Sequence, residues 1–202
     1  MEKIKELKNE LFKKRFLLID GEVNRERSDE IDEGIFALSL KGSDPIKIIF
    51  RTNGGSTSWG LRMYDAIKSA PVETIGYGVN RCSSAGLYPF AGCVKRIGMP
   101  HSRYLFHSMR TNFSVLHNHP FGVSVEDQIK GQLNQGNLLH ERKQKALLSE
   151  LTISPEKLLE LEREGDENDR FLFPEEALGI GLLTEIGGYK PEENFWKHLI
   201  KK

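Results

Sequence analysis

The chain has 202 residues, and its 29 basic residues are balanced by 29 acidic ones, so the formal net charge is zero. This balance argues against a generic binder of nucleic acid or anionic membranes, which needs net basicity or a basic block. Hydrophobic residues make up 38% of the chain, no apolar run approaches the roughly 20 residues that span a bilayer, and two cysteines are too few for a disulfide framework. We therefore expect a cytoplasmic globular protein that binds neither nucleic acid nor membrane.

The first half of the chain predicts alternating strands and helices. Residues 1–14 are expected to form a charged N-terminal helix or extension that either packs on the body or lies free. The main domain is expected over residues 15–202. Its predicted strands are 16–19, 46–50, 72–77, 95–99 and 104–106. Its predicted helices are 28–39, with Ser28 as N-cap, 56–68 and 83–92.

This order of elements predicts an α/β fold. Short apolar strands separated by helices indicate right-handed βαβ crossovers and a buried, mainly parallel sheet. Ligands of such sheets bind at the carboxyl ends of the strands. Residues 53–58 and 78–86 follow two of the predicted strands and are therefore where we expect chemistry.

After His107 the alternation of short apolar strands and helices stops, and the sequence becomes more polar. Ser124 and Asp127 have capping-box spacing, and they open a long polar helix that is expected to end near Leu151. A second helix over 154–162, an acidic loop over 166–169 and a compact αβ unit over 171–186 follow. The long helix is too polar to be wholly buried, so residues from about 108 to 164 are expected to form a handle that projects or meets another subunit.

Several residues could build a serine-nucleophile site. Such a site needs a serine on a tight turn at a helix start, a histidine base, a carboxylate and backbone N–H groups for the oxyanion. The chain offers CSSAG at 82–86, His107 after a strand, Asp169 in the acidic loop, and Gly54 with Gly55 as close-approach backbone. Each feature alone is more often structural, and only the ordered set points to catalysis.

The set resembles the caseinolytic (Clp) protease family, the ClpP-like serine peptidases, over about residues 15–186. The segments that carry the resemblance are RFLLIDGEV (15–23), NGG (53–55) with MYD (63–65), CSSAGLYPFAG (82–92), KRIGMPHSRYLFH (95–107), and DRFL (169–172) with EEA (175–177). The resemblance implies a ClpP/crotonase-type fold with a protruding helical handle. It assigns the general base to His107 and its orienting carboxylate to Asp169.

Two serines compete for the role of nucleophile. Counting back from the Ala91-Gly92 pair, the resemblance favours Ser83, with one inserted residue upstream and an oxyanion hole formed by Gly55 and Ser84. Ser84 as alternative nucleophile requires two extra residues upstream and one fewer downstream, but it recovers the serine-x-glycine pattern through Gly86.

The resemblance implies a serine endopeptidase that needs no cofactor and no metal. It also implies a ring-shaped homo-oligomer, in the usual case two stacked rings, and an AAA+ Clp ATPase that feeds it peptide and protein substrates. An alternative is a catalytically inactive scaffold subunit, which is supported by the bulky residues before the serines, Asn80 to Cys82. A stand-alone phage-type maturation protease and a crotonase-type acyl-CoA enzyme are further alternatives. His117 and His119 could ligate a metal, but no third ligand is evident.

Overall fold

A computed structural model describes residues 2–110, 114–115 and 120–187. The first part of the chain contains α1 (Glu2–Lys13), β1 (Phe16–Val23), α2 (Arg25–Ser39), β2 (Ile46–Gly55), α3 (Thr57–Lys68), β3 (Thr74–Ser83), a 3₁₀ turn η1 (Ser84–Gly86) and α4 (Leu87–Gly92). It continues with β4 (Lys95–Gly98), β5 (Arg103–Leu105), α5 (Val125–Leu148), α6 (Pro155–Asn168), α7 (Pro174–Gly179) and β6 (Glu185–Ile186).

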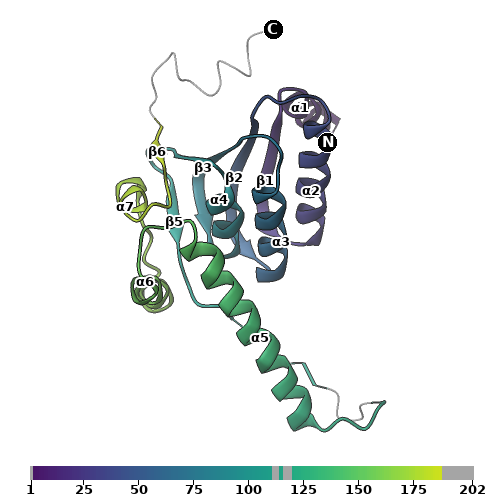
Figure 1. The fold of residues 1–202 in the computed structure, drawn as a ribbon, viewed down its shortest axis with the longest axis vertical. Helices are drawn as coiled ribbons and strands as arrows, with labels where there is room; N and C mark the ends of the chain where they lie inside the picture. The colour runs from purple at the N-terminus through teal and green to yellow at the C-terminus, as the bar shows by residue number, and fades with distance from the viewer. Residues whose placement is uncertain (1, 111–113, 116–119, 188–202) are drawn as a thin grey trace.

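The strands form one parallel sheet in the order β1-β2-β3-β4-β6, and β5 pairs with the far end of β3. The helices that link successive strands pack beside this sheet (Figure 1). The α/β class and the mainly parallel sheet expected from the sequence are therefore confirmed. The parallel order also places the ends of β2, β3 and β5 at one edge, where the next subsection finds the site.

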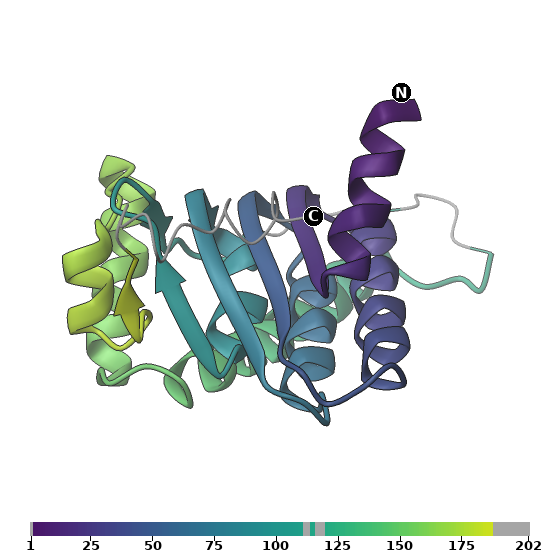
Figure 2. The same cartoon turned by 90° about the horizontal axis from the view of Figure 1, so that it is seen from above.

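One face of the sheet is more deeply buried than the other. In β2 the side chains of Ile46, Ile48 and Phe50 are fully buried, whereas Lys47 is half-buried and Arg51 is exposed. Helices α2 and α3 lie along one face (Figure 2), and this covering produces the alternation, because successive side chains of a strand point to opposite faces. The sheet is thus less completely buried than the apolar strands predicted.

Several element ends differ from the predicted ones, and three of them bear on the site or on helix capping. Asn24, not Ser28, caps α2, because its side chain accepts a 2.9 Å hydrogen bond from the N–H of Arg27, while Ser28 is buried inside the helix. Strand β2 continues to Gly55, beyond its predicted end at residue 50, so residues 53–55 belong to the strand rather than following it. Helix α6 continues to Asn168, so Asp166 lies in its last turn rather than in a loop.

Helix α1 packs on the body only near its C-terminal end. Leu11 is 7% exposed, whereas Leu7, one turn earlier, is 60% exposed. The sequence left open whether this helix packs on the body or lies free. In the structure the turn around Leu11 packs on the body, whereas Leu7 is exposed.

Helix α5 begins as predicted and extends away from the body (Figure 1). The side chain of Ser124 accepts a 3.1 Å hydrogen bond from the N–H of Asp127, which caps the helix. Only the C-terminal third is buried, at Lys143, Ala146 and Leu147. Although α5 has 24 residues, neither it nor another helix of the described residues is long and apolar enough to cross a bilayer.

Candidate active site

A cavity of about 860 Å³ lies where β2 and β3 end and where the chain leaves β5. Asn53 and Gly55 reach it from β2, Ser84 from η1, and His107 from the segment that follows β5. Residues of α5 line the opposite side, so the cavity lies between the sheet edge and the long helix. The lining from α5 is Asp127, Gln128, Gly131, Gln132, Gln135, Gly136 and Leu139.

The two candidate serines occupy different environments. Ser83 is fully buried, is absent from the cavity lining, and its hydroxyl accepts a 3.0 Å hydrogen bond from Nε of Arg81. Ser84 lines the cavity together with His107. Its φ angle of 55° is in the left-handed region, which a non-glycine residue adopts rarely and often at functional turns. The structure thus places Ser84, and not Ser83, in the cavity that His107 also lines.

An irregularity in β3 bears on the choice between these serines. Gly78 and Cys82 lie opposite Phe50 and Thr52, so four residue steps of β3 match two steps of β2. Asn80, inside this bulge, has a φ angle of 66°. A bulge of this kind accommodates extra residues within a paired strand. It therefore has room for the two upstream insertions that the Ser84 alternative requires.

Two glycines at the end of β2 pack closely against other backbone: Gly54 against Ser83 and Ser84, and Gly55 against Val23 of β1. A Cβ atom added to Gly54 would lie 2.5 Å from Cβ of Ser84 and 2.8 Å from the carbonyl oxygen of Ser83, and Gly54 has a φ angle of 96°. Gly55 lines the cavity and has a φ angle of 153°. Only glycine fits both the spacing and the dihedral angles, so this backbone is well placed to contribute an N–H to an oxyanion hole.

The ring of His107 is oriented by backbone. Its Nδ1 lies 2.6 Å from the carbonyl oxygen of Ser108. Because a carbonyl oxygen only accepts, Nδ1 carries the proton and Nε2 keeps the lone pair that a general base needs. Ser84 and His107 line one cavity, but no hydrogen bond joins their side chains in the described part of the chain. Such contacts often tighten only when substrate binds.

The carboxylate beside His107 is that of Asp166. Its Oδ1 lies 4.0 Å from Nδ1 of His107, and its Oδ2 accepts a 3.2 Å hydrogen bond from the N–H of Ser108. Asp169, which the family motif assigns to this role, is exposed at the end of α6 with a φ angle of 48°. No ion pair within 4.0 Å joins Asp169 to His107 among the described residues. The sequence did not single out Asp166, because an acidic residue three positions before Asp169 is typical of a solvated loop.

Neighbouring reactive groups are held neutral. Cys82, beside the serines, is fully buried, and this burial raises the pKa of its thiol. Tyr88 lines the cavity, and burial raises the pKa of its hydroxyl. A hydrogen bond with Thr57 lowers this pKa, whereas the negative charge of Glu162 raises it. His117 and His119, considered as metal ligands, lie outside the described residues.

The glutamine face of α5 is a part of the site that the sequence did not reveal. Gln128, Gln132, Gln135 and Leu139 line the cavity at the three- and four-residue spacing of one helix face. The amide of Gln132 binds the backbone of Ser114 twice, accepting from its N–H at 3.0 Å and donating to its carbonyl oxygen at 2.6 Å. The helical spacing of these glutamines was the only sequence signal for this part of the site, but polar residues at that spacing usually belong to a solvent-exposed helix face.

Comparisons with known proteins identify the family of the chain. The sequence model of the Clp protease family matches residues 1–190. The "ATP-dependent Clp protease proteolytic subunit 2" of Treponema denticola is 28% identical over 175 residues, which cover 85% of this chain and 81% of that protein. The "proteolytic subunit 1" of Gloeobacter violaceus is 30% identical over 177 residues, covering 84% and 83%.

A solved structure shares the fold. A point mutant of ClpP1 from Listeria monocytogenes superimposes with a TM-score of 0.73 at 22% identity, and the match covers 93% of this chain and 98% of that one. The family match over nearly the whole chain, together with the parallel sheet and the serine and histidine at its edge, leads to one conclusion: the chain belongs to the Clp protease family.

Proposed function

We propose that the chain is a serine endopeptidase in which Ser84 is the nucleophile and His107 the general base. The observation that carries the proposal is that Ser84 and His107 line one cavity at the sheet edge while Ser83 is buried and bound to Arg81. Membership of a protease family supports the class of reaction.

The geometry supports an acyl-transfer mechanism. Nε2 of His107 takes the proton of the Ser84 hydroxyl as its oxygen attacks the scissile carbonyl, and later delivers that proton to the leaving amine. The N–H groups of Gly55 and of Ala85, the residue after the nucleophile, receive the developing oxyanion. The Ser108 carbonyl fixes the tautomer, and the nearby Asp166 carboxylate stabilises the imidazolium.

The proposal includes assembly. We propose a ring-shaped homo-oligomer that works with an AAA+ ATPase on peptide and unfolded protein substrates. The names of the relatives, ATP-dependent proteolytic subunits, support a partner that hydrolyses ATP. The projecting part of α5 supports a subunit contact, because Leu133 and Leu138 are 45% and 48% exposed on it.

Labelling with a fluorophosphonate, followed by peptide mapping, tests the nucleophile. Ser84→Ala is expected to abolish labelling and to lower peptide cleavage by about 10⁴-fold, while the matched Ser83→Ala keeps a labelled Ser84. The opposite pattern would restore Ser83 as nucleophile. No labelling of the assembled wild-type protein would instead favour the inactive scaffold, for which the missing Ser84–His107 hydrogen bond is the specific observation.

Paired carboxamide variants test the third member. Asp166 has the contacts with the base, and Asp169 has the family motif. Asp166→Asn is expected to lower kcat by about 10-fold or more with KM unchanged, because the imidazolium loses its carboxylate neighbour. Asp169→Asn is expected to have the smaller effect. A larger loss in Asp169→Asn would mean that the end of α6 rearranges in the working enzyme.

A further inference from the structure

A lysine and a glutamate form an ion pair inside the protein, where α5 crosses α6. Lys143 is 1% and Glu162 is 2% exposed, and Nζ lies 2.7 Å from Oε1. Among the described residues these are the charged side chains with the deepest burial. The pair lies behind the base and takes no part in the mechanism above.

Stability alone does not explain this pair. Moving two charges out of water costs more than a typical ion pair returns unless every hydrogen-bonding position is used. The second oxygen of Glu162, Oε2, is buried and has no hydrogen-bond partner in the described part of the chain. Two apolar side chains of similar size would fill the site at least as favourably, so the charges call for another role.

The contacts of the pair suggest that role. Nζ of Lys143 donates a 3.4 Å hydrogen bond to the carbonyl oxygen of His107. The neighbouring residues are held from the same side: a Cβ atom at Gly165 of α6 would lie 1.8 Å from the carbonyl oxygen of Phe106, and Asp166 accepts from the N–H of Ser108. Three consecutive residues around the base thus rest on α5 and α6.

We propose that the Lys143–Glu162 pair is a positioning device for His107, fixing the peptide plane from which the imidazole extends into the cavity. The inference rests on the proposed function in taking His107 as the base. Lys143 supplies the donor, and Glu162 holds the ammonium group in place and neutralises it. Because Lys143 belongs to α5, the device also connects the long helix with the base.

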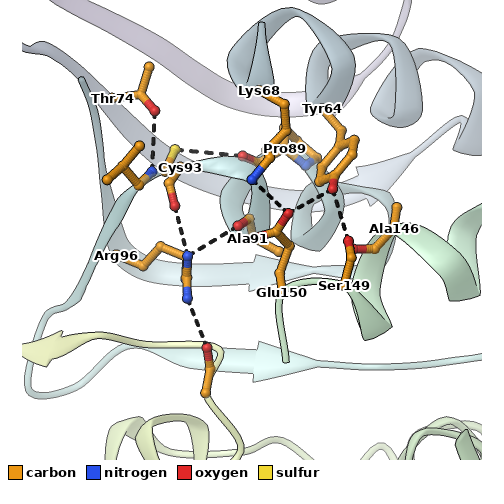
Figure 3. A network of polar contacts seen from close by, with 12 residues as sticks. Tyr64, Lys68, Thr74, Pro89, Ala91, Cys93, Arg96, Ala146, Ser149 and Glu150 are labelled. Carbon is orange, nitrogen blue, oxygen red and sulfur yellow. Dashed lines mark hydrogen bonds and ion pairs between the residues drawn. The ribbon is translucent and has the colours of Figure 1, made fainter. Parts of the chain in front are cut away.

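A second ion pair at the foot of α5 provides a matched control (Figure 3). Nζ of Lys68 lies 2.9 Å from Oε1 of Glu150, which also accepts a 2.8 Å hydrogen bond from the hydroxyl of Tyr64. This pair joins α3 to the residues just after α5, as Lys143–Glu162 joins α5 to α6. Neither of its two members lines the cavity or contacts His107.

The experiment compares two apolar double variants, Lys143→Met with Glu162→Leu and Lys68→Met with Glu150→Leu. The first is expected to keep the melting temperature, to lower kcat by about 10- to 100-fold and to leave KM unchanged, because small misplacements of a catalytic group have effects of this size. The control is expected to keep kcat per folded protein. Wild-type kcat in a folded Lys143→Met, Glu162→Leu protein would overturn the proposal.

Two further measurements cover the case in which the double variant folds poorly or the peptidase is inactive. Lys143→Arg keeps a cation and a hydrogen-bond donor, and it is expected to retain more than a third of wild-type kcat. The single variant Lys143→Met is expected to retain less than a third. Amide hydrogen exchange of the peptide that contains residues 106–108 measures how firmly the backbone around His107 is held, and it does not require an active enzyme. Exchange there is expected to rise in both Lys143→Met proteins and not in the control. Unchanged exchange would refute the device, while a wild-type enzyme without peptidase activity would refute only the proposed function.

Discussion

The two ends of helix α5 differ in what surrounds them. At the C-terminal end Leu147 is 1% exposed and packs with the hydrophobic core. Toward the N-terminal end Leu133 and Leu138 are about half exposed, and Phe121, just before the helix, is 87% exposed. One helix therefore has one end held by the core of its own chain and another on which Leu133 and Leu138 are only about half covered. Most of the stability of a helix in a protein comes from the packing of its apolar face, so the rest of the chain stabilises the two ends of α5 to different extents.

The largest effect is expected from a charge on the projecting end. Leu133→Glu is expected to split the proposed oligomer without unfolding the subunit, because it places a carboxylate at a half-exposed apolar position of the proposed subunit contact. Peptidase activity is expected to fall with assembly by about 10-fold or more. Sedimentation velocity beside a small-peptide assay measures both quantities. A fully active monomer would contradict both the assembly and the role of the handle.

Truncating side chains at each end compares their contributions to folding. Leu147→Ala is expected to lower the free energy of unfolding by about 2–4 kcal/mol, since it opens a cavity in the core. Leu133→Ala is expected to change that of the isolated subunit by less than about 0.5 kcal/mol. Urea unfolding of both variants, at a protein concentration where the subunits are dissociated, measures the difference. Equal losses would mean that the projecting end packs within its own chain.

Two glycine substitutions sharpen the comparison with a steric argument. Gly165→Ala is expected to cost about 1–3 kcal/mol of stability, because the new Cβ would lie 1.8 Å from the carbonyl oxygen of Phe106 and would push α6 from the base. Gly131→Ala, where a Cβ meets nothing within 4 Å, is expected to stabilise α5 by up to about 1 kcal/mol through helix propensity. Thermal unfolding measures both, and a stabilising Gly165→Ala would contradict the close packing of α6 on the base segment.

The smallest effect concerns pH at the foot of α5. Burial opposes ionisation of Glu150, but hydrogen bonds from Lys68 and Tyr64, with the charges of Lys68 and Arg96, lower its pKa overall. The stabilisation is therefore present above the unfolded value of about 4.3 and lost as pH falls through the lower folded value.

Glu150→Gln measures this contribution. The wild type is expected to be more stable than the variant by less than about 1 kcal/mol near pH 7. The gap is expected to close as the pH falls below about 4. A gap that widens in acid would contradict the direction of the shift.

The amino-acid sequence by itself determined the order of elements and the edge of the sheet that carries the site. Apolar runs of β length, helical spacing between them and the capping pair Ser124 and Asp127 are local signals, and the structure has each of these elements. The ordered motifs also identified the family, which the family match confirms. His107 was expected directly after a strand, and it lies two residues beyond the end of β5.

Only the tertiary structure decided which side chains meet. Adjacent serines have the same local signal, and the bulge in β3 that turns Ser84 to the cavity depends on pairing with β2. Asp166 and Asp169 differ by less than one helical turn, so the extent of α6 determines which of them reaches His107. Lys143 and Glu162 look like solvated charges in the sequence. Their burial arises because α5 and α6 pack together, a contact between segments that local sequence patterns do not encode.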